Sequence, residues 1–384
     1  MIEHLPSDWR KAKLLGRLMS REGPTPVLVL DGRLIDVSVI APTTSFFLSA
    51  WDGTLPQGRD LGPLENFEFR RRWEGGGGVR LLAPVDLQCI KACGVTFAVS
   101  AVERVIEERA HGEAGRAEAI RQALCDRVGA ELRSVKPGSP EAEKLKQVLT
   151  SDGLWSQYLE VAIGADAEVF TKAPCLSSVG WGDFVGVRSD SVWTNPEPEI
   201  VLVCDRNGRA LGAALGNDVN LRCFEGRSAL LLGKAKDNNA SCAIGPFIRL
   251  FDETFGIDDV RRADISLHVE GEDGFELTGS SSMSLISRDP LELVAQTMGV
   301  HHHYPDGVAL FLGTMFAPVE DRDAKGRGFT HHPGDIVRIS TAKLGVLENK
   351  VTRCDLAPAW EFGLGDLMCN LAARGLLAPE KVRQ

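Results

Sequence analysis

The segment from residue 195 to 218, NPEPEIVLVCDRNGRALGAALGND, constrains the fold more than any other part of the chain. An apolar run, IVLVC, precedes Asn207-Gly208, a dipeptide strongly preferred in tight turns between antiparallel strands. We therefore predict a hairpin whose turn is centred on this dipeptide. Such a turn places Asp218 directly opposite Glu197, and a buried hairpin of this kind implies a largely antiparallel sheet.

The hairpin predicts a cluster of acidic side chains. Glu197 and Glu199 are two residues apart, so on an extended strand both leave by the same face. Directly opposed residues have Cβ atoms about 5 Å apart, so Asp218 joins them, while Gly216, opposite Glu199, leaves room for a ligand. Carboxylates this close raise one another's pKa unless a cation is bound or some are protonated. Donors that are all oxygen favour Mg2+ or Mn2+ over Zn2+.

The E-P-E motif also has a simpler interpretation, as a solvated strand end with surface acids. Pro196 and Pro198 donate no ladder hydrogen bond, so the strand is open to an irregular start. A bulge would shift the register by one residue and separate the carboxylates.

Bulk properties exclude several classes of function. The formal charge of −10 and the pI near 5.4 argue against a broad nucleic-acid or anionic-membrane surface. Nine cysteines without a framework spacing fit free thiols in a reducing compartment, and the Cys89/Cys93 pair lacks the further ligands of a zinc site. No apolar run approaches the ~18 residues of a membrane span, and the start lacks a signal-peptide pattern. We expect a cytoplasmic protein.

The order of segments predicts an α+β chain in two parts. Residues 1–84 form a small β-rich domain with a hairpin turn at Asp31-Gly32, and Gly75–Gly78 is a flexible joint rather than a phosphate loop. Residues 85–384 form the larger domain, a mostly antiparallel sheet system with helices concentrated in one insertion. Expected helix features are a cap at Ser100, the periodic stretch AGRAEAIRQALCDRVG, and a start at Ser139-Pro140.

The motifs, taken in order, resemble the fumarylacetoacetate hydrolase family. The family pattern has an E-x-E pair followed by N-D, a lysine before G-P, a G-T dipeptide after an apolar strand, and then G-D-x-V and L-G-x-L-x-N-x-V. The matching positions here are Glu197, Glu199, Asn217-Asp218, Lys236 before Gly245-Pro246, Gly313-Thr314, Gly334–Val337 and residues 344–351. The resemblance implies a mixed, mostly antiparallel β-sandwich roll as the C-terminal fold and a homodimer or homotetramer.

Within the family the chain is most similar to dehydratases of 2-keto-3-deoxy-pentonates. This resemblance implies loss of water from 2-keto-3-deoxy-D-xylonate or -arabinonate to give 2,5-dioxopentanoate, in non-phosphorylative pentose degradation. Hydrolytic members carry a His and a Glu three residues apart on a lid helix, whereas the matching positions here are Ser100 and Glu103. The missing His disfavours acylpyruvate-type hydrolysis. That reaction, an oxaloacetate-type decarboxylation and a metal-binding protein without turnover stay open as alternatives.

The resemblance also assigns roles to residues. It implies that Glu197, Glu199 and Asp218 bind Mg2+, with Mn2+ or Ca2+ as alternatives, and that Lys236 and Glu168 form the acid–base pair, with either order of roles possible. It places Thr314, Gly313, Ser100 and Glu103 beside the substrate. A nearby metal ion and burial would lower the pKa of Lys236 enough for a base. Without the resemblance, Lys236 would be interpreted as an exposed lysine balancing Asp237.

Two other groups of polar residues have plain structural interpretations. His301–His303 and His331-His332 suggest a polar loop near the ligand entrance, because adjacent residues of a strand alternate faces and cannot all ligate one ion. The helix with Arg104, Glu107 and Arg109 carries a charged face that solvation and i,i+4 pairs explain.

Overall fold

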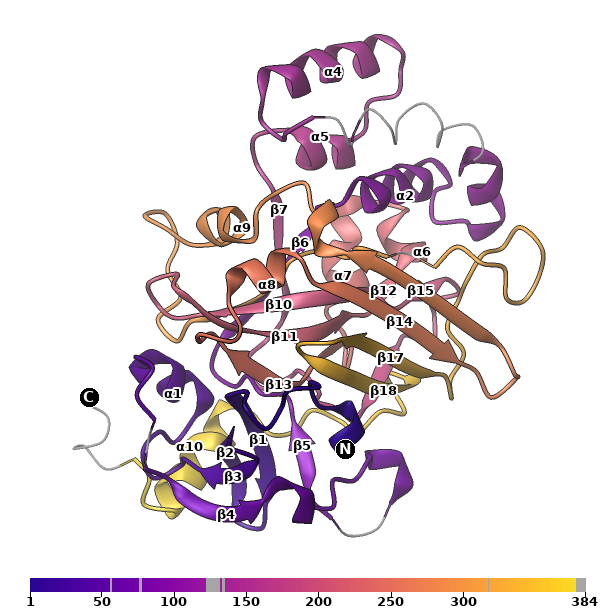
Figure 1. Ribbon diagram of the computed structural model, residues 1–384. Helices are drawn as coiled ribbons and strands as arrows, with labels where there is room; N and C mark the ends of the chain where they lie inside the picture. The colour runs from indigo at the N-terminus through magenta and orange to yellow at the C-terminus, as the bar shows by residue number, and fades with distance from the viewer. Residues whose placement is uncertain (56, 76–77, 122–131, 133–134, 317, 378–384) are drawn as a thin grey trace.

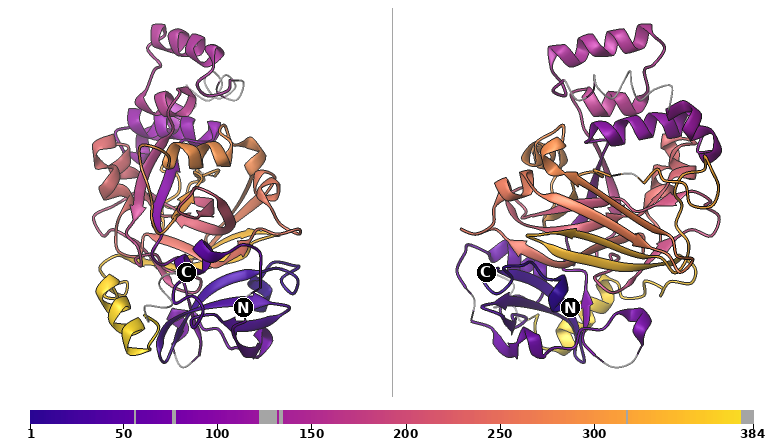
Figure 2. Two further views of the ribbon diagram at one scale, coloured as in Figure 1. Left: turned by 90° about the vertical axis from the view of Figure 1, so that its left-hand side faces the viewer. Right: turned by 45° about the vertical axis from the view of Figure 1, so that its right-hand side comes forward.

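The structure is a computed structural model that describes residues 1–55, 57–75, 78–121, 132, 135–316 and 318–377. It is a mixed α/β protein in which two sheets pack together at the centre (Figure 1). Helices α2, α4 and α5 lie at one end of the molecule, and strands β1–β5 with helix α10 lie at the opposite end (Figure 2). Among the described residues, no helix is both long and apolar enough to cross a membrane.

The larger sheet has eleven strands in the order β4-β3-β2-β1-β13-β11-β10-β16-β6-β7, with β5 also paired to β1. Its pairs are antiparallel except β16 with β6. The strands are β1 (Leu14–Ser20), β2 (Gly23–Leu30), β3 (Arg33–Asp36), β4 (Arg59–Pro63), β5 (Arg80–Leu82), β6 (Cys89–Gly94), β7 (Glu168–Ala173), β10 (Pro198–Cys204), β11 (Ala210–Asp218), β13 (Cys242–Leu250) and β16 (Val308–Phe311).

The second sheet has five strands in the order β15-β14-β17-β18-β8, and only β18 and β8 pair in parallel. They are β8 (Phe184–Val187), β14 (Asp264–Glu270), β15 (Glu276–Ser282), β17 (Ile336–Thr341) and β18 (Gly345–Arg353). A short two-stranded ribbon joins β9 (Thr194–Asn195) to β12 (Asn220–Leu221).

The helices connect and cover these sheets. They are α1 (Thr44–Ala50), α2 (Ala98–Arg109), α4 (Pro140–Ser151), α5 (Gln157–Ile163), α6 (Arg222–Glu225), α7 (Leu232–Lys236), α8 (Ile257–Arg261), α9 (Pro290–Thr297) and α10 (Leu364–Ala373). Short 3-10 turns are η1 (Ile2–His4), η2 (Leu64–Asn66), η3 (Arg72–Glu74), η4 (Ala229–Leu231) and η5 (Met283–Leu285). The start predicted at Ser139-Pro140 is confirmed, since the Ser139 hydroxyl accepts from the Ala142 N–H. Residues 114–121 of AGRAEAIRQALCDRVG are helical, and the rest, 122–129, lies outside the described residues.

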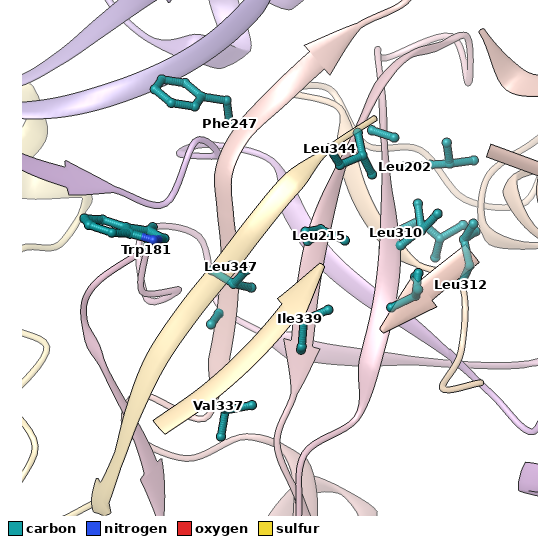
Figure 3. Packing of buried hydrophobic residues seen from close by; sticks show 14 of the residues in the cluster. Trp181, Leu202, Leu215, Phe247, Leu310, Leu312, Val337, Ile339, Leu344 and Leu347 are labelled. Atoms are coloured by element: carbon teal, nitrogen blue, oxygen red, sulfur yellow. The ribbon is translucent and has the colours of Figure 1, made fainter. Parts of the chain in front are cut away.

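The larger sheet is buried on both faces, which explains the unbroken apolar run in β10. Side chains alternate along a strand, so Ile200 and Leu202 pack on one face and Val201 and Val203 on the other. On the first face they meet β17 and β18, and Figure 3 shows Leu215 and Leu347 in this shared core. Face-to-face burial of two sheets therefore holds β10 and β11 rigidly in the middle of the molecule.

The hairpin predicted around Asn207-Gly208 is present, but its turn has a different form. The Asp205 N–H donates to the Arg209 carbonyl at 3.0 Å, and Gly208 takes a left-handed φ of 78°. Three residues therefore form the loop, in place of the two expected.

A second irregularity restores the predicted register. The pairing of β10 with β11 shifts by one residue between Val203 and Cys204, which compensates for the extra residue of the loop. Beyond that point Glu199 faces Gly216, as predicted. The Asp218 N–H donates to the Glu197 carbonyl at 3.1 Å, so these two residues are opposed across the ladder.

The N-terminal strands continue the larger sheet. The predicted turn at Asp31-Gly32 is confirmed by the pairing of Leu30 with Arg33 and by positive φ angles at both turn residues. β1 pairs with β13 through Leu14 and Leu15, so residues 1–84 share a sheet with the rest of the chain. Gly75 and Gly78 have positive φ angles, and the two glycines between them lie outside the described residues. The boundary at residue 84 stays a prediction.

Candidate metal and acid–base site

The hairpin brings the three predicted carboxylates together. Glu199 lies in β10, Glu197 directly precedes it, and Asp218 ends β11. One carboxylate oxygen from each lies within 4.8 Å of the others, and all three side chains are buried. Among the described residues this is the one group with the geometry to hold a metal ion through His, Cys, Asp or Glu side chains.

Lys236 lies against this cluster, at the end of α7. Its ammonium donates to a Glu197 carboxylate oxygen and, at 3.0 Å, to Asp218, and it lies over the Phe170 ring at 5.6 Å. Burial by itself would lower the pKa of Lys236, but the carboxylates of Asp218 and Glu197 outweigh it and raise the pKa. The interpretation as an exposed lysine paired with Asp237 is wrong.

One face of β7 points into the site. Side chains two apart on a strand share a face, and this face carries Glu168, Phe170 and Lys172. The fully buried Lys172 ammonium lies 2.7 Å from an Asp218 carboxylate oxygen and donates to the Val219 carbonyl at 3.1 Å. Lys172 therefore holds Asp218 from the side opposite the Lys236 contact, since the two lysines reach different oxygens of that carboxylate.

Glu168 occupies a space that a glycine provides. It pairs with Gly94 across β7 and β6, and a Cβ on Gly94 would lie 1.9 Å from a Glu168 carboxylate oxygen. Burial, and then the nearby charge of Glu225, raise the pKa of Glu168 to about 7. The side chain therefore exchanges a proton near neutral pH, which is the property that a general acid or base needs.

A second set of buried ions reaches the cluster from α2. The Arg104 guanidinium donates to Glu197 and also contacts Glu107 and, at 3.1 Å, Glu225. Arg222 in turn lies 3.1 Å from Glu107. Although burial opposes ionisation of Glu197, Lys236 and Arg104 lower its pKa to about 2.

Charge in the site is unbalanced in favour of anions. Within the described residues, the buried charged groups that make up the cluster and its ion pairs are the carboxylates of Glu107, Glu197, Glu199, Asp218 and Glu225 and the cations of Arg104, Lys172, Arg222 and Lys236. Glu199 has the weakest compensation. Burial, Asp218 and Glu197 raise the pKa of Glu199 well above its ordinary value. An oxygen-rich, buried and under-neutralised site of this kind fits a hard divalent cation.

Gly313 and Thr314 lie beside the carboxylates but with their own contacts. The Gly313 N–H donates to Glu199 at 2.7 Å, and Gly313 has a φ of 101°, where a side chain would be strained. The Thr314 hydroxyl donates to the Phe316 carbonyl at 3.0 Å. Gly313 thus positions a carboxylate of the cluster, and the substrate contacts expected of both residues stay predictions.

The structure corrects two expectations for α2. The helix begins at Ala98 with Phe97 as its cap, so Ser100 is not the cap residue, and its hydroxyl instead bonds back to the Phe97 backbone. Arg104 and Glu107 are buried rather than solvated, because the ion pairs with Glu225 and Arg222 compensate their charges.

Glu103 pairs with a neighbour outside the cluster. Its two carboxylate oxygens accept from Arg121 at 2.9 and 2.8 Å. Its expected place beside the substrate stays a prediction, as does that of Ser100.

The remaining polar groups divide between surface and core. His301–His303 are exposed, whereas His331 lies buried in the loop before β17, with its Nδ1 3.1 Å from Asp335. The expected place of these histidines near the ligand entrance stays a prediction. The described cysteines are all free, as predicted, and Cys125 lies outside the described residues.

Sequence reasoning missed Lys172, Arg104, Glu107, Arg222 and Glu225. Lys172 had a usable signal, because it lies four residues after Glu168 on one strand and therefore on the same face. The other four residues had none, since charged residues are rarely buried and their partners come from separate elements.

Comparison with known proteins extends these observations. No protein-family model matches the chain. It is 34% identical over 196 residues to the 2-dehydro-3-deoxy-D-arabinonate dehydratase of Saccharolobus solfataricus, a match that covers 51% of this chain and 62% of that protein. It is 32% identical over 195 residues to the probable 2-keto-3-deoxyxylonate dehydratase of Haloferax volcanii, covering 51% and 63%. The matched region thus spans less than two thirds of these relatives.

Solved structures show the same fold over a longer range. The apo form of 2-keto-3-deoxy-D-arabinonate dehydratase superposes with a TM-score of 0.63 at 23% identity, covering 89% of this chain and 99% of that one. The same dehydratase complexed with magnesium and 2,5-dioxopentanoate has a TM-score of 0.62 at 23% identity and the same coverage. An isomerase of 2-hydroxyhepta-2,4-diene-1,7-dioate from Mycobacterium marinum follows at 0.52 and 18% identity, covering 89% and 99%. The chain is therefore similar in sequence to 2-keto-3-deoxy sugar-acid dehydratases over about half of its length, and it shares the fold of the solved dehydratase structures.

Proposed function

We propose that this protein catalyses the Mg2+-dependent dehydration of a 2-keto-3-deoxy-D-pentonate to 2,5-dioxopentanoate. The observation that carries the proposal is the meeting of three buried carboxylates with Lys236 and with Glu168, whose pKa lies near neutrality. Homology to sugar-acid dehydratases supports the choice of reaction. The fold alone does not, because an isomerase shares it.

Glu197, Glu199 and Asp218 would hold the cation, with Mn2+ or Ca2+ as alternatives to Mg2+. When bound, the ion would polarise the keto group of the substrate and so acidify the protons on C3. The site holds one more carboxylate than cation even before Glu168 is counted. A divalent ion together with a monoanionic keto acid would bring that excess to zero.

The protein's own groups would move the protons. Removal of a proton from C3 and departure of the C4 hydroxyl as water leave a C3–C4 double bond. Transfer of a carbon-bound proton from C5 to C3 then gives the C4–C5 enol, and movement of its hydroxyl proton to C4 gives the aldehyde. The atoms balance as one pentonate giving one dioxopentanoate and one water. Lys236 and Glu168 supply the acid and the base. Cation binding would neutralise the carboxylates that hold Lys236 as an ammonium, which lowers its pKa toward the useful range.

The site favours elimination over hydrolysis. Hydrolysis needs a base that activates water, and the helix position where a His would serve is occupied by Ser100, whose hydroxyl is bonded to the Phe97 backbone. Glu103, three residues on, is held by Arg121. Neither residue is free to act on a water.

The test is incubation of the purified protein, loaded with Mg2+ or Mn2+, with 2-keto-3-deoxy-D-xylonate and with its L-arabinonate counterpart. We expect an aldehyde product that is detected as a bis-hydrazone, which the substrate with its single keto group cannot form, and that is lost when the metal is chelated. An acylpyruvate serves as the control substrate and should not be cleaved. No aldehyde from either pentonate with both metals, or cleavage of the acylpyruvate alone, would overturn the proposal.

Three further features belong to the same proposal. We propose that residues 1–84 and 85–384 are the two domains, that the sheets form the sandwich roll of fumarylacetoacetate-hydrolase-like proteins, and that the chain assembles as a homodimer or homotetramer. The face-to-face packing of the two sheets supports the second point. Light scattering of the purified protein measures the third.

A further inference from the structure

A cavity of about 240 Å³ lies between the N-terminal strands and the body of the protein, lined by residues other than those of the carboxylate cluster. β1 and β5 form one wall, the segment 176–183 and the loop at 239–240 form another, and residues 358–362 close it on the side that leads to α10. Figure 1 shows β1, β5 and α10 together at this end of the molecule. A water molecule takes about 30 Å³ of liquid, so the space suits a small organic molecule.

Two arginines of this cavity have one carboxylate near them. Arg72 donates to Asp183 at 3.3 Å, and Arg80 is close enough to both for their charges to act on its guanidinium. Burial, and then the proximity of Arg72, lower the pKa of Arg80. One carboxylate does not neutralise two guanidinium groups, so this part of the cavity has an excess of positive charge.

Polar atoms of the cavity wall lack partners. The Nε of Arg80 and the hydroxyl of Ser178 are both buried, and neither has a hydrogen-bond partner in the described part of the chain. Buried donors are almost always satisfied in folded proteins, because an unmet buried donor destabilises the folded state. Arg80 and Ser178 both line this cavity, and guanidinium and hydroxyl groups are donors from which carboxylate and phosphate groups accept.

The other charged groups of the wall do not cancel this preference. Arg17 is satisfied by the carbonyls of Ala83 and Val85. Glu361 lies at the exposed end, where water screens its charge. Trp360 is also partly exposed there and offers an apolar surface to the body of a ligand.

We propose that this cavity is a binding site for a small organic anion, whose carboxylate or phosphate group is held by Arg80, Arg72 and Ser178. This site is separate from the proposed catalytic cluster. Whether this cavity binds an anion is therefore independent of whether the protein is a dehydratase.

The test is calorimetric titration of the metal-loaded protein, at constant ionic strength, with inorganic phosphate and separately with gluconate. We expect saturable binding of at least one of these two anions. Which anion binds shows whether the site accepts a phosphate or a carboxylate. Arg80→Gln should raise the Kd about tenfold or more, the loss typical of a charged hydrogen bond. Ser178→Ala, which removes one uncharged donor, should raise it about three- to fivefold.

The matched control is Arg327→Gln, which removes an exposed arginine elsewhere on the surface and should leave the Kd unchanged. Thermal unfolding without ligand shows whether each variant is folded. If Arg80→Gln does not fold, the Kd of Ser178→Ala tests the proposal. Absence of saturable binding of both anions, or equal Kd values in wild type and Ser178→Ala, would overturn the proposal.

Discussion

At the scale of single residues, the site depends on buried charges that compensate one another. Glu197 is held ionised by Lys236 and Arg104, whereas burial and its acidic neighbours work against ionisation of Glu199. A side chain that is buried among opposite charges cannot be removed without leaving its partner exposed to the low dielectric of the interior. Single substitutions here should therefore affect cation binding and stability together.

Asp218→Asn should abolish metal dependence and lower dehydratase activity at least about 100-fold, because it removes one of the three anionic ligands. Metal titration by calorimetry and the aldehyde assay measure the two effects. Asp237→Asn is the matched control, since it changes an exposed Asp directly after Lys236 and should retain both properties. Full activity of Asp218→Asn would contradict the proposed site.

Glu168 predicts a pH dependence of stability. Its pKa is about 7 in the folded protein against an ordinary value of 4.5, so the folded state holds the proton more tightly. The stability that this tighter proton binding gives to the folded state is present below pH 4.5 and is lost as the pH rises through 7. In the presence of a chelator, Glu168→Gln should equal wild type at pH 4 and exceed it at pH 8 by up to about 3 kcal/mol. Urea unfolding at both pH values measures this difference, and equal stability at pH 8 would disprove the shift.

At the scale of elements, α2 is tied to the hairpin by ions rather than by apolar contact alone. Arg104 joins Glu107 on its own helix to Glu225 on α6 and to Glu197 before β10. The rest of the helix packs its apolar face against α5 and Trp193. The position of α2 over the site is thus coupled to the same charges that would bind the cation.

Arg104→Met should lower the free energy of unfolding by about 3 kcal/mol or more, because Glu107 and Glu225 lose a shared buried partner. Arg109→Met on the same helix is the control. Its guanidinium makes one exposed contact, with the Gly153 carbonyl at 3.2 Å, so we expect a loss below about 1 kcal/mol. Urea denaturation of both variants measures the contrast, and similar losses would show that the Arg104 network contributes little.

At the scale of the whole molecule, one sheet runs from the N-terminal strands through the site. β1 pairs with β13, β13 with β11, and β11 with β10, so the hairpin of the carboxylates is joined to residues 1–84 by continuous ladders. Arg249 adds two bonds across this seam, to Asp8 at 2.7 and 2.8 Å. Cooperative unfolding of both parts follows from such continuity.

Differential scanning calorimetry should accordingly show a single transition for the full chain. Arg249→Met should shift that transition to lower temperature without splitting it, because the seam is weakened but the ladders persist. Two separate transitions in wild type would mean that residues 1–84 unfold independently of the rest.

Features that depend on local sequence pattern and spacing were predictable. The apolar run of β10, the Asn-Gly turn and the two-residue spacing of Glu197 and Glu199 predicted the hairpin and its three carboxylates. The register was predicted correctly although the turn was not, because the extra loop residue and the irregularity at Val203 cancel. Local backbone signals do not reveal such a pair of compensating shifts.

Which charges are buried, and with which partners they pair, depends on how the folded elements meet. Arg104 lies on α2, Lys172 on β7, and Arg222 and Glu225 on α6, and each is stable inside the protein because a partner from another element meets it there. Burial lowers the pKa of Lys236, but the adjacent carboxylates of Asp218 and Glu197 raise it, whereas burial and then Glu225 raise the pKa of Glu168. Electrostatic compensation acts through space, so no spacing along the chain encodes it.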